Sequence, residues 1–131
     1  MLIDDDKIFV ALTKMVIAET NFSGKIDVFE NGQDALDFLA QITEKDELLP
    51  EIIFLDLNMP VLDGWGFLEE FTLMKPKIEK EITIYIVSSS VSPHDINRAK
   101  NINIVSGFII KPVTKDKYKD IIKNYLDGKI V

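Results

Sequence analysis

Two kinds of hydrophobic pattern alternate along the chain, and each predicts a different secondary structure. Uninterrupted apolar runs occur within 51–56 (EIIFLD) and 81–90 (EITIYIVSSS), with shorter runs at 2–3 and 107–112. Residues 25–31 (KIDVFEN) instead alternate between apolar and polar positions, which is typical of a strand with one face in water. We therefore expect five strands.

Helical periodicity fills the segments between these strands. Apolar residues recur at three- and four-residue intervals over 8–16, 35–42, 64–75 and 118–126. A further helix is expected to begin at Ser92-Pro93-His94-Asp95, with Ser92 as N-cap, Pro93 at the first position and Asp95 reaching back toward the cap. Gly128 is expected to end the last helix.

Strands that are apolar along their whole length need cover on both faces, and a parallel sheet flanked by helices provides that cover. Five strand–helix units in succession therefore predict an α/β fold with a doubly wound parallel sheet. A chain of 131 residues has the size of one domain. In sheets of this type the functional groups lie beyond the carboxyl ends of the strands.

Polar residues that can bind a metal or take part in a reaction lie at four of these strand ends. They are Asp4, Asp5 and Asp6 after the first strand, Asp56 after the third, Ser88 at the end of the fourth and Lys111 at the end of the fifth. Crowded carboxylates repel one another and attract a hard cation, and Mg²⁺ prefers a few carboxylates together with water and a phosphate oxygen. A carboxylate beside such a cation can attack phosphorus, and Lys111 and Ser88 suit the charge of a transferred phosphoryl group. The pattern predicts an aspartyl phosphate on Asp56.

At these residues the chain resembles the receiver domain of two-component response regulators, in the stand-alone form found in chemotaxis response regulators. The matching segments are DDD at 4–6, FLDLNMPVLDGW at 54–65, IVSSS at 86–90 and GFIIKP at 107–112, in this order. The resemblance covers essentially the whole chain. It implies a five-stranded parallel sheet in the order 2-1-3-4-5, the flavodoxin-like fold with five helices.

The resemblance also implies a role for each site residue. Asp56 corresponds to the phospho-acceptor, and Asp4 and Asp5 to the acidic pair that binds Mg²⁺ with it, Asp5 being the more direct ligand. Asn58 corresponds to the residue whose backbone carbonyl binds the metal, Ser88 to the switch hydroxyl, Phe108 to the switch aromatic residue and Lys111 to the phosphate-contacting lysine. A cis peptide bond is implied between Lys111 and Pro112.

The implied function is that of a single receiver domain over 1–131 with no output domain. It would accept a phosphoryl group from a histidine kinase or a histidine phosphotransfer protein and would catalyse only its own phosphorylation and dephosphorylation, so it would not be an enzyme in the usual sense. Phosphorylation would switch the surface of the fourth helix, fifth strand and fifth helix for an unidentified downstream protein. A homodimer is compatible with this reading.

Composition narrows the functional classes further. The net charge is −7, and no basic cluster is dense enough to indicate nucleic-acid binding. No apolar stretch approaches the length of a membrane span. The absence of cysteine removes disulfides, thiolate catalysis and zinc–thiolate sites. We expect a cytoplasmic protein that binds neither nucleic acid nor a membrane.

Two other classes of protein share part of this pattern. A phosphatase of the haloacid dehalogenase type also uses an Asp nucleophile and Mg²⁺, but the second acid of its D-x-D motif is Asn58 here, and the motif lies in the middle of the chain. A receiver-like module that binds partners without being phosphorylated is the other alternative. The intact acids, Ser88 and Lys111 argue against it, because such a module does not need them.

Simpler structural roles are expected for several residues near the site. Asp6 fits the N-cap of the first helix better than a metal ligand, Asp63-Gly64 fits a turn into the third helix, and His94 is expected to be exposed. The segments 41–50 and 75–82 look longer than this fold requires.

Overall fold

The computed structural model describes residues 1–130, with side chains described to residue 128. Its elements are β1 (Leu2–Ile3), α1 (Lys7–Ala18), β2 (Val28–Phe29), α2 (Gly32–Ala40), β3 (Ile52–Leu55), α3 (Gly64–Met74), the 3-10 turn η1 (Lys75–Lys77), β4 (Thr83–Ser88), α4 (Pro93–Lys100), β5 (Val105–Ile110) and α5 (Lys115–Ile130). The five strands form one parallel sheet in the order β2-β1-β3-β4-β5. The predicted fold class and strand order are confirmed.

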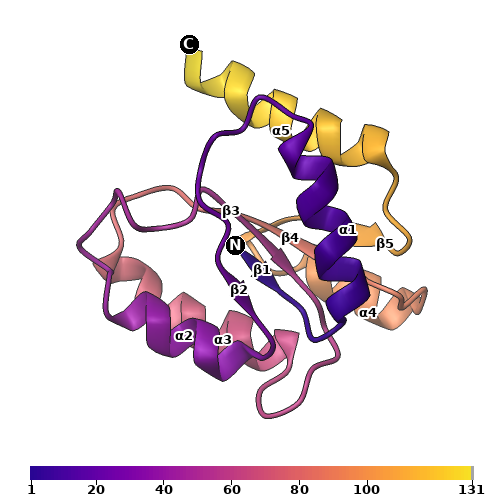
Figure 1. Cartoon of the computed structure of the whole chain (residues 1–131). Helices are drawn as coiled ribbons and strands as arrows, with labels where there is room; N and C mark the ends of the chain where they lie inside the picture. Colours follow the sequence, from indigo (N-terminus) through magenta and orange to yellow (C-terminus); the bar gives the residue numbers. More distant parts are fainter. Residues whose placement is uncertain (131) are drawn as a thin grey trace.

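Helices cover both faces of this sheet, as its apolar strands require (Figure 1). On one face, α2, α3 and α4 enclose a core that includes Ile53, Leu55, Phe67, Phe71, Ile84 and Ala99. On the other face, α1 and α5 enclose a core that includes Ile17, Phe54, Val87, Tyr118 and Ile122. Neighbouring residues of β3 and β4 therefore alternate between the two cores, which explains why both strands are apolar throughout.

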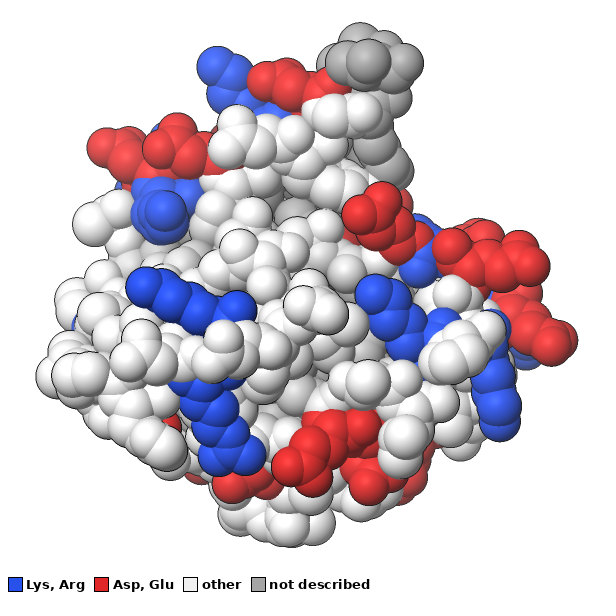
Figure 2. Space-filling view, turned by 180° about the vertical axis from the view of Figure 1, so that it is seen from behind, with Lys and Arg blue, Asp and Glu red and all other residues white. Residues whose placement is uncertain are grey.

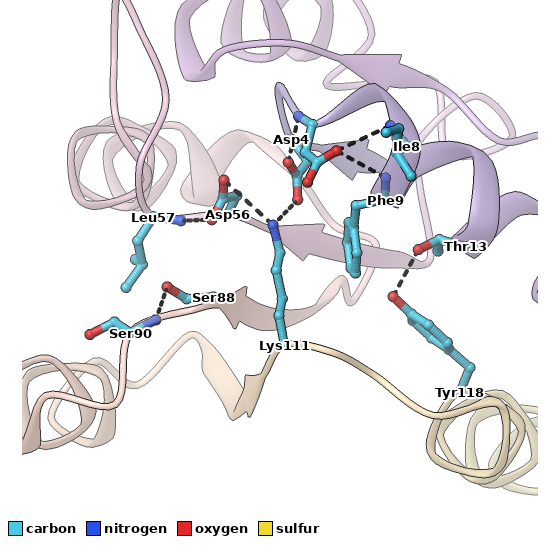
Figure 3. A network of polar contacts seen from close by, with 11 residues as sticks. Asp4, Ile8, Phe9, Thr13, Asp56, Leu57, Ser88, Ser90, Lys111 and Tyr118 are labelled. Atoms are coloured by element: carbon cyan, nitrogen blue, oxygen red, sulfur yellow. Dashed lines mark hydrogen bonds and ion pairs between the residues drawn. The ribbon is translucent and has the colours of Figure 1, made fainter.

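A buried pair of hydroxyl groups joins α1 to α5. The hydroxyl oxygens of Thr13 and Tyr118 are 2.9 Å apart, and the Tyr118 ring meets Phe54 edge-on at 5.4 Å. Burial raises the pKa of Tyr118 to about 12, so this phenol stays protonated at neutral pH. The contact fixes the helix pair beside the sheet face that carries Asp4 and Lys111 at its edge (Figure 3).

Side-chain caps at three helix starts hold the loops around the carboxyl ends of the strands. Asp6 is the N-cap of α1, as predicted, and its Oδ1 accepts from the backbone N–H groups of Ile8 and Phe9 at 3.1 Å. Asp63 caps α3 by accepting from Gly66 N at 2.8 Å, and Asn31 caps α2. The prediction of a turn into the third helix at Asp63 is confirmed.

Gly64 permits α3 to start very close to the end of β3. Its N–H donates to the Leu57 carbonyl at 3.0 Å, and a Cβ at this position would lie 2.5 Å from the carbonyl oxygen of Asp56. That distance is impossible for any side chain, and the obstructing atom belongs to the backbone. A larger residue would therefore move the backbone that carries Asp56.

Several predicted boundaries differ from the structure. The strand expected over 25–31 is limited to Val28–Phe29. The prediction that Gly128 ends the last helix is wrong, because α5 continues to Ile130. No glycine among the described residues has a positive φ, so Gly128 does not take the left-handed conformation of a C-terminal cap. The peptide bond between Lys111 and Pro112 is cis, as the resemblance implied.

The start of α4 is only partly as predicted. Ser92 is the N-cap and Pro93 the first helical residue, but the Ser92 side chain makes no capping hydrogen bond. The Asp95 carboxylate does not reach back to the cap either, because it accepts from the Ser90 hydroxyl at 2.7 Å. The expected capping box is therefore wrong: Ser92 is still the N-cap, but Asp95 bonds to Ser90.

The two segments that look long in the sequence contact each other at the amino end of the sheet. The ammonium group of Lys80 donates to the carbonyl oxygens of Asp46 and Leu49 at 2.9 and 3.0 Å, and it lies 3.6 Å from the Glu51 carboxylate. The extra length of 41–50 and 75–82 thus lies just before β3 and β4, away from the strand ends that carry the predicted site.

Charged side chains of both signs share the molecular surface. On the face turned away from Figure 1, Lys and Arg occur singly or in small groups among acidic and uncharged residues (Figure 2). Within residues 1–130, no helix has the length and apolar composition needed to cross a membrane.

Candidate functional site

The predicted site residues meet at the carboxyl edge of the sheet. Asp4 follows β1, Asp56 follows β3, Ser88 ends β4 and Lys111 follows β5 (Figure 3). Since β1, β3, β4 and β5 are consecutive neighbours in the sheet, their ends bring these four side chains together from distant parts of the sequence.

Three carboxylates form a cluster at this edge. Asp4, Asp5 and Asp56 each contribute one oxygen to a group whose members lie within 4.8 Å of one another. Asp4 and Asp56 are buried, with 4% and 7% of their surface exposed, whereas Asp5 faces solvent. All three offer hard oxygen ligands, which fits Mg²⁺ or a similar divalent cation.

Backbone N–H groups hold the two buried carboxylates in place. Asp4 Oδ1 accepts from Asp6 N at 2.9 Å, and Asp56 Oδ1 accepts from Leu57 N at 2.9 Å. The second oxygen of each carboxylate, Oδ2, lies on the side of the Lys111 ammonium group. Asp6 itself is outside the cluster, because its carboxylate is engaged in capping α1.

Lys111 supplies the positive charge at the centre of the site. Its Nζ lies 2.9 Å from Asp4 Oδ2 and 3.8 Å from Asp56 Oδ2, so its close partner is Asp4 (Figure 3). Its backbone N–H donates to the Ser88 carbonyl at 2.8 Å. The ammonium group also lies 4.3 Å from the centre of the Phe9 ring, a cation–π contact.

The surplus negative charge is visible in the acidity of Asp56. Burial, and after it the neighbouring Asp4 carboxylate, raise the pKa of Asp56 from 3.8 to about 6. Lys111 and the backbone N–H groups of Leu57 and Asn58 act in the opposite direction. One ammonium group therefore does not compensate for burial and for the second carboxylate, and a bound cation would favour the ionised form of Asp56.

Ser88 and Phe108 lie on the face of the sheet that α4 covers. Ser88 is fully buried, and its Oγ accepts from Ser90 N at 3.1 Å. Phe108 pairs with Ile86 in the ladder between β4 and β5, two residues before the partner of Ser88. Its ring is partly buried and lines a groove of about 420 Å³ between α4 and β5.

Asn58 follows Asp56 by two residues in the loop that leads to α3, and its side chain is exposed. Its place in the loop is compatible with a backbone ligand to a metal, and this role stays a prediction. His94 is exposed in the first turn of α4, as expected.

Sequence reasoning missed two residues that act on this site. Phe9 lies under the Lys111 ammonium group, and its signal was its position in the first turn of α1, from which a side chain points back toward the helix start. Ser90 links Ser88 to α4. No signal for this role is present in the sequence, because three consecutive serines, at 88–90, do not reveal which one finds a partner.

Comparison with known proteins agrees with this geometry. The family model described as the response regulator receiver domain matches residues 1–123. The crystal structure of a two component response regulator from Cytophaga hutchinsonii is 27% identical, covers 96% of this chain and 94% of its own, and superposes with a TM-score of 0.83.

Two further solved structures of response regulators are similar to this chain. The phosphorylated cyanobacterial phytochrome response regulator RcpA is 25% identical, with a TM-score of 0.80 and coverage of 97% of this chain and 92% of its own. The Mn²⁺-bound form of response regulator Rcp1 is 25% identical, with a TM-score of 0.75 and coverage of 92% and 86%. With the family model spanning nearly the whole chain, the four converging strand ends and the order of the sheet, this chain belongs to the response regulator receiver domains of two-component signalling.

Proposed function

We propose that this receiver accepts a phosphoryl group on Asp56 from a histidine kinase or a histidine phosphotransfer protein in a Mg²⁺-dependent reaction. The observation that carries the proposal is the buried Asp56 carboxylate with Asp4, Asp5 and Lys111 around it. The aspartyl phosphate would then alter the surface formed by α4, β5 and α5 for a downstream partner. The only reaction proposed is the phosphorylation and dephosphorylation of the chain itself.

The hydrogen bonds of Asp56 favour Oδ2 as the attacking atom. Oδ1 is held by Leu57 N at 2.9 Å, while the nearest cation to Oδ2 is the Lys111 ammonium group at 3.8 Å. In the proposed step, a carboxylate oxygen forms a bond to phosphorus as the bond from phosphorus to the donor imidazole nitrogen breaks. The donor histidine leaves with the electron pair and is then protonated by solvent.

Mg²⁺ would be held by the carboxylates of Asp4, Asp5 and Asp56 and by the backbone carbonyl of Asn58. When bound, it would neutralise charge on the phosphoryl oxygens. Lys111 would add a second positive charge from the β5 side of the site, where it already lies. Among the similar structures, Rcp1 is the Mn²⁺-bound form and RcpA is phosphorylated.

The switch would run through Ser88 and Phe108. A phosphoryl group on Asp56 offers oxygens to which the Ser88 hydroxyl can donate, and a rotated Ser88 would change the space beside β5. The Phe108 ring borders the groove between α4 and β5, so a change in its position would reshape that groove. Unequal contacts to the phosphoryl group in the two states supply the energy difference.

An apolar stripe on α1 is the surface we propose for docking of the phospho-donor. Ile8, Leu12 and Met15 are 76%, 56% and 65% exposed, and their spacing places them on one side of the helix. The stripe begins three residues after Asp5, so a donor helix that covers it would have its histidine near the site. A partner helix on this stripe would cover three large apolar side chains that are otherwise exposed to solvent.

Mass spectrometry of the intact chain tests the central step. With Mg²⁺ and acetyl phosphate, the wild type should gain one phosphoryl group, and Asp56→Asn should gain none. Asp63→Asn is the matched control, since Asp63 is an acid that caps α3 outside the cluster. Labelling of Asp56→Asn equal to that of the wild type would place the acceptor elsewhere.

A further inference from the structure

Three hydrogen bonds meet at Ser90, in the loop between β4 and α4. Ser90 N donates to Ser88 Oγ at 3.1 Å, Ser92 N donates to Ser90 Oγ at 3.2 Å, and the Ser90 hydroxyl donates to Asp95 Oδ2 at 2.7 Å. The chain of contacts therefore runs without a gap from the proposed switch hydroxyl to the first turn of α4 (Ser88 and Ser90 in Figure 3).

The strongest of these contacts is the one between Ser90 and Asp95. Its distance of 2.7 Å and its carboxylate acceptor are those of a charge-assisted hydrogen bond, which is stronger than a neutral one. The Ser90 hydroxyl has one proton, and this bond uses it. Neither Ser88 nor Ser92 makes an equivalent contact to α4 with its side chain.

Few other contacts hold α4 in place. Ala99 is the one residue of α4 that is buried, and the ion pair of Arg98 with Glu69 is long, at 3.9 Å, and exposed. Arg98 also stacks over the Trp65 ring at 4.3 Å, near the C-terminal end of the helix. The Ser90–Asp95 bond is thus a large part of what fixes the first turn of α4.

We propose that Ser90 is a positioning residue that holds α4 in its resting place and couples α4 to Ser88. When the Ser88 hydroxyl turns to a phosphoryl oxygen, Ser90 N loses its acceptor, the loop shifts, and the bond from Ser90 to Asp95 weakens. This inference rests on the proposed function, since it needs Ser88 to respond to the phosphoryl group. An interaction made only in the resting state lowers the affinity of a ligand that prefers the other state.

Hydrogen exchange of the α4 amides, without Mg²⁺ or any phosphoryl mimic, tests the resting role. Ser90→Ala and Asp95→Ala should each speed exchange over residues 93–100 by roughly three- to tenfold, the range expected for loss of one hydrogen bond. The double variant should be no faster than the faster single variant, because both remove the same bond. Ser90→Thr, which keeps the hydroxyl, and the distant Ser23→Ala should match the wild type.

Beryllofluoride binding in Mg²⁺ tests the coupling. Ser90→Ala should bind this phosphoryl mimic roughly three- to tenfold more tightly than the wild type, and Ser90→Thr should not. Unchanged α4 exchange and unchanged affinity in Ser90→Ala, or additive effects of the two alanine variants, would overturn the inference. A wild type that binds no beryllofluoride would instead overturn the proposed function, and the coupling with it.

Discussion

Lys111 pairs with Asp4 more closely than with the proposed phospho-acceptor Asp56. The two distances are 2.9 and 3.8 Å, although both carboxylates are buried beside the same ammonium group. The Lys111 charge therefore compensates only part of the free-energy cost of burying an ionised Asp56, and its pKa lies near 6. The stability of the fold should depend on this one carboxylate.

Asp56→Asn should stabilise the protein at pH 7 by about 1–3 kcal/mol, the free energy expected from a raised carboxyl pKa after allowance for partial solvation. Between pH 3.8 and about 6 the native state retains a proton that the unfolded state loses, so stability falls as the pH rises through this window. The gain in Asp56→Asn should accordingly shrink at pH values below 3.8.

Urea unfolding of both proteins at pH 7 and at low pH, without divalent cations, measures this difference. Mg²⁺ should recover the lost stability in the wild type at pH 7 and should have little effect on the variant. A variant less stable than the wild type at pH 7 would show that the Asp56 carboxylate is not a destabilising charge.

Binding of Mg²⁺ should distinguish Asp5 from Asp6. The Asp5 carboxylate belongs to the cluster of three, whereas Asp6 Oδ1 accepts two backbone N–H groups at the start of α1. Asp5→Ala should weaken Mg²⁺ binding in calorimetric titration by roughly tenfold or more, as expected for loss of a carboxylate ligand. Asp6→Ala should bind Mg²⁺ nearly normally and lose about 1 kcal/mol of stability with its cap. A larger loss of Mg²⁺ affinity in Asp6→Ala would mean that the acidic pair is shifted by one residue.

Ser88→Ala should separate phosphorylation from the response. The variant keeps Asp56 and the metal ligands, so it should still bind beryllofluoride, although several-fold more weakly, since one hydrogen bond to the mimic is lost. The amide chemical-shift changes over residues 92–105 should fall to less than half of those in the wild type. Thr13→Ala, which removes a buried hydroxyl on the opposite face of the sheet, is the control and should leave these changes in place. Shift changes of full size in Ser88→Ala would show that this hydroxyl does not couple the site to α4.

Leu12→Glu should block transfer from a protein donor and spare the chemistry. Leu12 lies in the middle of the exposed stripe of α1, and a carboxylate there would oppose an apolar partner helix. Phosphotransfer from a histidine phosphotransfer protein should slow by roughly tenfold or more, while labelling by acetyl phosphate should be unchanged. Leu73→Glu, at a position of α3 that is 73% exposed, is the matched control. Equal rates with the protein donor for both variants would exclude α1 as the docking surface.

Much of the site could be predicted because parallel strands deliver their last residues to one edge. The positions of Asp4, Asp56, Ser88 and Lys111 follow from the apolar runs that precede them, and the strand order then makes them neighbours. The N-cap at Asp6 and the turn into the third helix at Asp63 could also be predicted, since each of these side chains accepts from backbone N–H groups two or three positions ahead.

What could not be predicted depends on contacts between elements. Lys111 lies 2.9 Å from Asp4 and 3.8 Å from Asp56, and so small a difference between contacts from three strands leaves no mark in the sequence. The predicted contact of Asp95 was wrong because its carboxylate accepts from the Ser90 hydroxyl, which lies in the loop before the helix and not at its N-cap. The predicted end of α5 was wrong because a glycine can continue a helix, and nothing lies within 4 Å of a Cβ placed at Gly128.

The contact between Arg98 and Trp65 couples the position of α4 to the intrinsic tryptophan fluorescence of the protein. Trp65 is the only tryptophan of the chain, and the guanidinium carbon of Arg98 lies 4.3 Å from the centre of its ring. A charge at that distance affects the emission of an indole, so a movement of α4 that takes Arg98 away from the Trp65 ring should change the intrinsic fluorescence. Tryptophan emission therefore offers a label-free measure of the position of α4 when acetyl phosphate or beryllofluoride is added with Mg²⁺.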